Sequence, residues 1–118
     1  MNTIERKAIN FVIKYERAKK RYPEDVSKKL CGYDVKSKGR YIEVKGFKNV
    51  RYPVLSLHKS LKRQLRNKIH RYHIYIVYNI DNSPRLKILK PDIIAVNLEI
   101  DTRYIIRGKV YRHISDEL

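Results

Sequence analysis

The sequence contains a single cysteine, no tryptophan and few acidic residues. Cys31 has no second thiol for an internal disulfide and no thiolate partners for a metal, so we expect a reducing, cytoplasmic setting. Without tryptophan or a lipidation motif, an anionic membrane is a poor candidate partner. No apolar run approaches the roughly 20 residues that span a bilayer. The N-terminus lacks the apolar segment of a secretory signal, so no membrane association is predicted.

The chain also lacks internal repeats, low-complexity linkers and visible domain boundaries. With 118 residues it is long enough to bury a substantial core but too short to divide sensibly in two. We therefore expect one domain over residues 1–118.

Basic residues dominate the charge. Lys and Arg number 28 against 12 Asp and Glu, which gives a formal net charge of +16. Such an excess indicates a polyanionic partner, and nucleic acid comes first because Lys and Arg contacts to phosphate dominate its binding. A lysine-rich composition can also reflect genome bias or a hot habitat.

Hydrophobic periodicity predicts the order helix, three strands, helix, strand, strand. This order is typical of an α/β fold, a mixed sheet with helices on its faces, in which the second helix could cross from one strand to a parallel one. The tail from Pro91 could be strand, helix or both. The expected helices are 3–20 and 56–70, and the expected strands are 33–37, 40–46, 52–57, 72–80 (central) and 85–90 (more exposed).

Asp34 and Glu43 are acids within apolar, strand-forming segments of a basic chain. Because successive strand residues point to opposite faces, Glu43 and Lys45 share a face. Two carboxylates near a sheet edge repel each other, and Mg²⁺, which prefers oxygen ligands, would relieve that repulsion. Lys45 would then hold a water or offset transition-state charge rather than act as a general base. Alternatively, both acids are solvated or paired with nearby lysines.

The segments "YER", "PEDVS", "GYD" and "YIEVKG" occur in this order, followed by "VLSL" and "YHIYIVYNI". An Asp before a Glu-x-Lys resembles the PD-(D/E)xK nuclease superfamily, and the longer series resembles the NO VEIN C-terminal domain over roughly residues 4–92. The resemblance implies a restriction-endonuclease-like sheet flanked by helices. It further implies that Asp34, Glu43 and the Val44 carbonyl hold Mg²⁺ or Mn²⁺, with Lys45 as the catalytic lysine.

The first expected helix contains two further acids, Glu5 and Glu16. In the superfamily this helix often supplies another acid to the site, and Glu5 fits that position. Asn2 and Glu5 equally have the spacing of a capping box, in which Glu5 satisfies the helix N-terminus. Glu16 is expected on a solvated flank. Where relatives commonly carry an acid after the third strand, this chain has His58-Lys59-Ser60, which suggests phosphate contact and a member that binds better than it cuts.

Basic residues around the expected site and along the second helix are candidate contacts to nucleic acid. In that helix the positive charges are not interleaved with acids, unlike an ordinary exposed face. Tyr41 and Tyr52 are plausible substrate contacts, whereas Tyr75 looks like core. The candidate phosphate contacts are Arg40, Lys48, Arg51, Lys59, Lys62, Arg63 and Arg66.

Together these features predict a metal-dependent nuclease that hydrolyses phosphodiester bonds in DNA. A catalytically inactive nucleic-acid-binding module is an alternative, as is an accessory to a helicase or restriction complex. Cutting of both strands by so small a domain would favour a homodimer.

Overall fold

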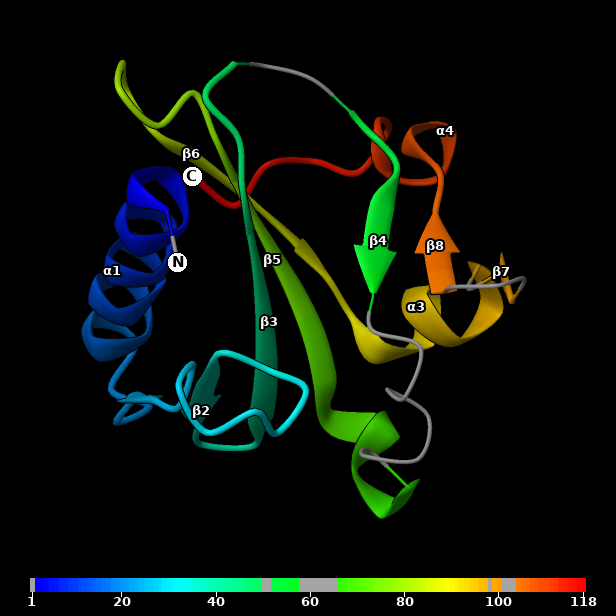
Figure 1. Cartoon of the computed structure of the whole chain (residues 1–118), viewed down its shortest axis with the longest axis horizontal. Coiled ribbons are helices and arrows are strands. Elements are labelled where there is room, and N and C mark those ends of the chain that lie inside the picture. Colours follow the sequence, from blue (N-terminus) through cyan, green and yellow to red (C-terminus); the bar gives the residue numbers. More distant parts are fainter. Residues whose placement is uncertain (1, 50–51, 58–65, 98, 101–103) are drawn as a thin grey trace.

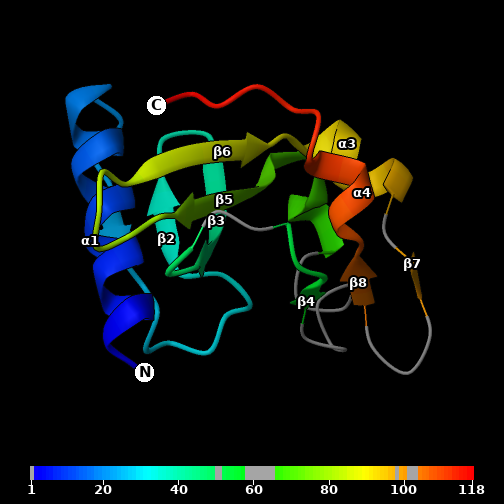
Figure 2. The ribbon, with the colours of Figure 1, turned by 90° about the horizontal axis from the view of Figure 1, so that it is seen from above.

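Two β-sheets and the helices that flank them form the part of the chain that the computed structural model describes, which is residues 2–49, 52–57, 66–97, 99–100 and 104–118. The elements are α1 (Thr3–Ala18), β1 (Glu24–Asp25), β2 (Val35–Ser37), β3 (Arg40–Gly46), β4 (Leu55–Leu57), the 3₁₀ helix η1 (Arg66–Arg71), β5 (Tyr72–Tyr78), β6 (Arg85–Leu89), α3 (Pro91–Asn97), β7 (Glu99–Ile100), β8 (Tyr104–Ile106) and α4 (Gly108–Tyr111). One sheet has the order β1-β2-β3-β5-β6 and the other β4-β8-β7. Helix α1 covers one face of the larger sheet, and the smaller sheet lies with α3 and α4 on the other side (Figures 1 and 2). The predicted α/β fold with a mixed sheet is confirmed.

Strand β5 is the centre of the larger sheet. It pairs in parallel with β3 and antiparallel with β6, and all seven of its residues are buried. Its β-branched and aromatic side chains fill both layers of the core, as the sequence predicts for a central strand. The parallel β3–β5 pair requires a crossover connection, which runs through β4 and η1 and includes residues outside the described part.

Helix α1 packs closely against β3 through small residues. Ala8, Ile9 and Val12 are buried against the sheet. A Cβ atom added to Gly46 would lie 2.7 Å from the Ala8 Cβ atom, so glycine permits this approach. The predicted helix over 3–20 and the hairpin around Lys38-Gly39 are thus confirmed, with the helix ending at Ala18.

Within the described ranges, no helix has the length and apolarity needed to cross a membrane.

The third predicted strand does not continue the first two. Strand β4 pairs with β8 in the smaller sheet, and the larger sheet instead gains the two-residue strand β1. The predicted start of the second helix at Ser56 is wrong, because Ser56 lies in β4. Residues 58–65 lie outside the described part, and residues 66–71 form a 3₁₀ helix.

Strand β6 is not the exposed strand that its sequence predicts. Four of its five residues are buried, and the C-terminal segment runs back beside it (Figure 2). Glu117 N–H donates to the Leu86 carbonyl at 2.8 Å, and Leu86 N–H donates to the Leu118 carbonyl at 3.3 Å. The ammonium group of Lys87 is 2.9 Å from Asp116. The distant tail therefore covers an edge that local polarity marks as open.

Glu16 is fully buried rather than on a solvated flank. Arg21 donates to both of its carboxylate oxygens, at 2.7 and 2.6 Å. The Tyr75 hydroxyl donates to the same carboxylate at 2.7 Å, and Arg40 donates to the Tyr75 hydroxyl at 2.6 Å. Burial acts to raise the pKa of Glu16, but these hydrogen bonds and the Arg21 charge outweigh it and lower the pKa below its ordinary value. This network ties the end of α1 to β5 and β3.

We predict that Glu16→Gln lowers the free energy of unfolding by about 3 kcal/mol at pH 7, because it leaves Arg21 and Tyr75 without a buried anion. A depressed pKa gives stability that is present above the unfolded pKa and is lost as the pH falls through the folded one. The difference between the two proteins should therefore shrink below pH 4.5, the ordinary pKa of the group. Urea unfolding at pH 7 and pH 3 measures it, with the exposed Glu117→Gln as control. Equal losses at both pH values would contradict the electrostatic origin.

Candidate functional site

The site begins where β2 meets β3. Val35 pairs with Ile42, and the Asp34 N–H also donates to the Ile42 carbonyl at 2.8 Å. Two residues thus oppose one, which is the arrangement of a β-bulge. The Asp34 carboxylate accepts a hydrogen bond from Val44 N–H at 2.9 Å. Since the N–H and C=O of one residue leave a strand on the same side, the Val44 carbonyl points toward this edge as well.

Glu43 and Lys45 lie on the same face of β3, as alternation predicts. The Lys45 ammonium is 3.2 Å from the Glu43 carboxylate. It also donates to the backbone carbonyl of Ser56 in β4 at 2.8 Å. The smaller sheet therefore holds the lysine in place beside the acid.

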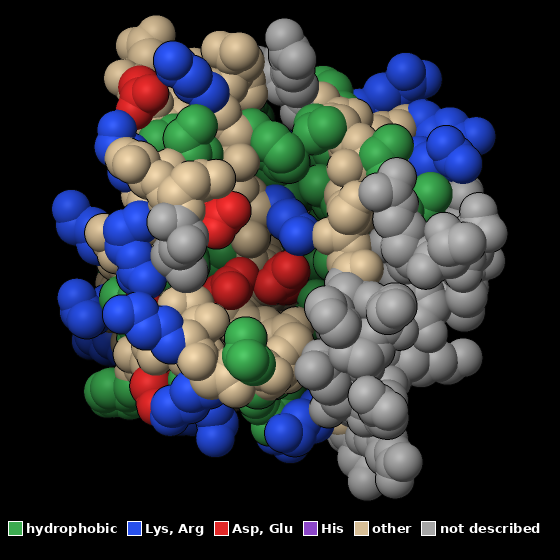
Figure 3. Space-filling model, in the orientation of Figure 1, with side chains coloured by type: hydrophobic (Ala, Val, Ile, Leu, Met, Phe, Trp, Pro, Cys, Tyr) green, Lys and Arg blue, Asp and Glu red, His purple; other side chains and the backbone are tan. Residues whose placement is uncertain are grey.

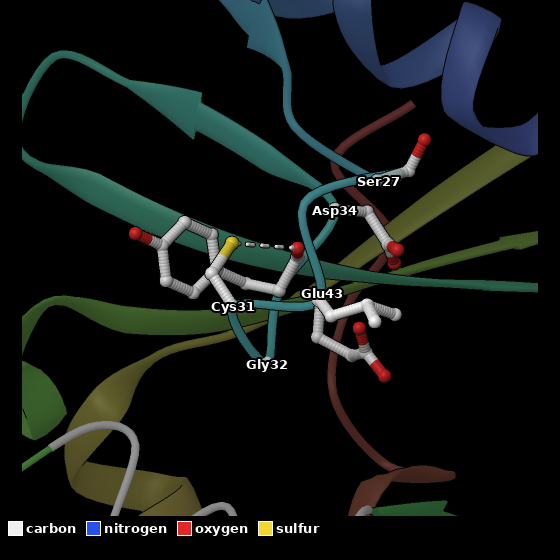
Figure 4. A pocket seen from close by; sticks show the side chains of 7 residues that line it. Ser27, Cys31, Gly32, Asp34 and Glu43 are labelled. Atoms are coloured by element: carbon white, nitrogen blue, oxygen red, sulfur yellow. Dashed lines mark hydrogen bonds between the residues drawn. The ribbon is translucent and has the colours of Figure 1, made fainter.

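A cavity of about 380 Å³ adjoins the two acids. Figure 4 shows the Asp34 and Glu43 side chains at this pocket, reached from different segments of the chain. In Figure 3, acidic side chains gather beside a basic one in a hollow of the surface, with further basic side chains at its margin. The residues that line the pocket are Ser27, Leu30, Cys31, Gly32, Tyr33, Asp34 and Glu43.

Glu43 is the electrostatically costly member of the site. Burial raises its pKa to about 8, the Lys45 ammonium opposes the shift, and the neighbouring Asp34 carboxylate adds to it. Without a further cation near the pair, Glu43 holds its proton at neutral pH. An added positive charge at this edge would let both carboxylates ionise.

The donor groups at this edge suit a hard divalent cation. Two carboxylates and a backbone carbonyl are the oxygen ligands that Mg²⁺ and Mn²⁺ prefer. Across the described ranges, no three or more His, Cys, Asp or Glu side chains gather closely enough to hold a metal ion by themselves. One or two carboxylates completed by waters and substrate phosphates is a common Mg²⁺ arrangement in phosphoryl-transfer sites. Asp34, Glu43 and Val44 would thus hold the ion.

Glu5 is part of the cap of α1. Its N–H donates to the Asn2 side chain at 2.8 Å, and the Asn2 amide donates back to the Glu5 carboxylate at 3.2 Å. The first bond is the N-cap bond that the predicted capping box contains, whereas the second comes from the Asn2 side-chain amide and not from its backbone N–H. The carboxylate is exposed, and its suggested role as a third acid stays a prediction.

Only some of the candidate phosphate contacts lie in the part of the chain that the structure describes. Arg40 points to the α1 side of the sheet, where it bonds Tyr75 and lines a second cavity with His70, His73 and Lys90. The structure thus places Arg40 away from the face of Glu43, because residues 40 and 43 have opposite parity on β3. Lys48 is exposed after β3. Arg51, Lys59, Lys62 and Arg63 lie outside the described residues, as does the side chain of Arg66.

Sequence reasoning missed three neighbours of the site, Tyr33, Lys68 and Tyr72, of which the first two lie against Tyr41, a predicted substrate contact. Tyr33 and Tyr41 pack with ring centroids 4.9 Å apart, and the Lys68 ammonium lies 5.3 Å from the Tyr41 centroid. Tyr72 is buried, and burial, followed by the charges of Glu43 and Asp34, raises the pKa of its hydroxyl. The register of β5 against β3 brings Tyr72 to this face, and no local signal in the sequence reveals that register. Tyr52 instead packs against Tyr111 of α4.

The fold and the site define a mixed α/β domain with a carboxylate pair and a lysine at one sheet edge. The family described as "Protein NO VEIN, C-terminal" matches residues 4–89. The chain therefore belongs to the NO VEIN C-terminal family, and the matched region contains every residue of the site described above. No curated protein matches the sequence.

We predict that Glu43→Gln stabilises the metal-free protein at alkaline pH. Because the folded pKa is raised, the folded state keeps a proton that the unfolded chain releases above pH 4.5, and stability falls as the pH rises toward 8. Glutamine removes that fall, for a gain on the order of 2 kcal/mol at pH 9 that vanishes near pH 5. Urea unfolding in chelator measures it. A variant that is less stable than the wild type at pH 9 would contradict it.

Proposed function

We propose that this protein is a divalent-cation-dependent nuclease that hydrolyses phosphodiester bonds in DNA. The observation that carries the proposal is the convergence of Asp34, Glu43 and Lys45 on one sheet edge beside an open cavity. Membership of the NO VEIN C-terminal family supports the fold but does not by itself supply an activity.

Each group of the site has a distinct task in this proposal. Asp34 and Glu43, with the Val44 carbonyl, hold Mg²⁺ or Mn²⁺. The bound cation would polarise a phosphoryl oxygen and lower the pKa of the attacking water. Lys45 is fixed by Ser56 and Glu43, so its ammonium is preorganised to offset the negative charge that develops on the phosphoryl oxygens.

The net charge supports nucleic acid as the partner. A charge of +16 favours a polyanion over other substrates that contain phosphate. Beside the cavity, Tyr33, Tyr41 and Lys68 place aromatic rings and an ammonium group together. Aromatic faces and lysine are the two kinds of group that contact unpaired bases and phosphates. A helicase or restriction component remains a proposed partner protein, and a homodimer a proposed assembly.

We predict that purified protein cleaves plasmid or single-stranded DNA with Mg²⁺ or Mn²⁺ and not with chelator. Asp34→Asn, Glu43→Gln and Lys45→Met should each reduce the cleavage rate by at least about 100-fold. Each removes a charged side chain that would contact the cation or the reacting phosphate. Gel assays of initial rates measure the loss.

Asp81→Asn is the matched control, since Asp81 is exposed and pairs only with Lys7 among its described contacts. It should cleave at the wild-type rate. Cleavage that survives all three site substitutions would indicate a contaminant or another site. Binding without cleavage under every metal condition would favour the inactive binding module, and absence of binding at low salt would favour the accessory role.

We predict that Lys68→Ala weakens DNA binding and lowers the slope of log affinity against log salt by about 1, because one phosphate contact is lost. Lys14→Ala, an exposed lysine on α1, should leave the slope unchanged. Fluorescence anisotropy over a salt series measures both. Equal slopes for the two variants would remove Lys68 from the proposed interface.

A further inference from the structure

Tyr72 places a buried hydroxyl group without a partner on the sheet face that carries the carboxylate pair. The residue is fully buried. It pairs with Tyr41 across the parallel β3–β5 ladder, so its side chain lies on the face of Glu43 and Lys45. Its hydroxyl accepts and donates no hydrogen bond within the described part of the protein.

An unpartnered buried hydroxyl is uncommon, since most buried polar side-chain atoms are hydrogen-bonded. In the described ranges the condition is shared with one oxygen of Asp116. That oxygen lies 2.9 Å from the Lys87 ammonium, whose charge compensates it. The buried hydroxyls of Tyr75 and Tyr111 both donate to oxygen acceptors. Tyr72 therefore differs from Tyr75 and Tyr111, whose buried hydroxyls have acceptors.

The surroundings of Tyr72 favour its hydroxyl as a hydrogen-bond donor to a carboxylate. Burial raises the pKa of its hydroxyl well above the ordinary value, and the charges of Glu43 and Asp34 raise it further. A phenol O–H can donate one hydrogen bond. The two groups that act on it are carboxylates, and an ionised carboxylate can only accept hydrogen bonds.

We propose that Tyr72 is a positioning residue for Glu43. Its hydroxyl donates a hydrogen bond to the ionised Glu43 carboxylate, directly or through one water, and turns that carboxylate toward a divalent cation. This inference rests on the proposed function, because it assigns Tyr72 to the same cation site. Carboxylates that bind metals are themselves commonly hydrogen-bonded. Loss of such a hydrogen-bond donor lowers the affinity for the metal about 10- to 100-fold.

The test is Tyr72→Phe, which removes the hydroxyl oxygen and keeps the ring. Mn²⁺ affinity, measured without nucleic acid by calorimetry and electron paramagnetic resonance, should fall at least about tenfold. The urea midpoint of the metal-free variant should equal or exceed that of the wild type, because phenylalanine removes a buried donor that had no partner. A role in packing alone predicts no loss of Mn²⁺ affinity.

Tyr75→Phe is the matched control on the other face of β5. It loses a hydroxyl that is bonded to Glu16, so its urea midpoint should fall while its Mn²⁺ affinity stays that of the wild type. Asp34→Asn should abolish Mn²⁺ binding and thereby mark the site.

The outcomes separate this inference from the proposed function. If Asp34→Asn abolishes binding but Tyr72→Phe binds Mn²⁺ like the wild type, the role of Tyr72 is overturned and the cation site stands. If Tyr72→Phe is destabilised as much as Tyr75→Phe, the hydroxyl is structural and the inference is again overturned. If the wild type itself binds no Mn²⁺, the proposed function and the inference are overturned together.

Discussion

The hydrogen bond from Val44 N–H to the Asp34 carboxylate joins the sheet to its site. It occurs at a bulge, where the strand ladder between β2 and β3 ends and a backbone donor would otherwise face the cavity. A side chain takes the place of the missing strand neighbour. Because the same carboxylate lies next to Glu43, the hydrogen bond that satisfies the Val44 N–H also fixes the position of Asp34 relative to Glu43. Strand alternation then places Lys45 on the face of Glu43.

This arrangement concentrates like charge in a partly buried place. The Lys45 ammonium compensates only part of the cost, since it is shared with the Ser56 carbonyl and the pKa of Glu43 stays near 8. The second sheet contributes through that carbonyl, which explains why β4 matters to the site without joining the larger sheet. The opposite face solves a similar problem completely, for there Arg21 and Tyr75 surround the buried Glu16. An acid whose charge is fully compensated is typical of a structural network, whereas a pair whose charge is only partly compensated is typical of a candidate reactive centre.

Much of this could be predicted from the sequence where local rules decide. Alternation placed Glu43 and Lys45 on one face, and apolar periodicity gave α1 and the buried strand β5. The burial of Glu16 could not be predicted, because its ligands come from a loop and a distant strand. The exposure expected for β6 failed for the same reason, since the residues that cover it arrive from the C-terminal tail. The position of Tyr72 on the face of the site could not be predicted either. It depends on the register of the parallel β3–β5 pair, whose connection is long, and tertiary packing sets such a register.

The covering of β6 also limits how copies of this protein could associate. The larger sheet ends on one side in the two-residue strand β1 and on the other in a strand whose outer groups at Leu86 already bond the chain's own tail. Short or occupied borders resist the addition of a foreign strand. A continuous sheet shared between two copies through β6 would first have to displace that tail, so this edge is poorly suited to pairing two copies.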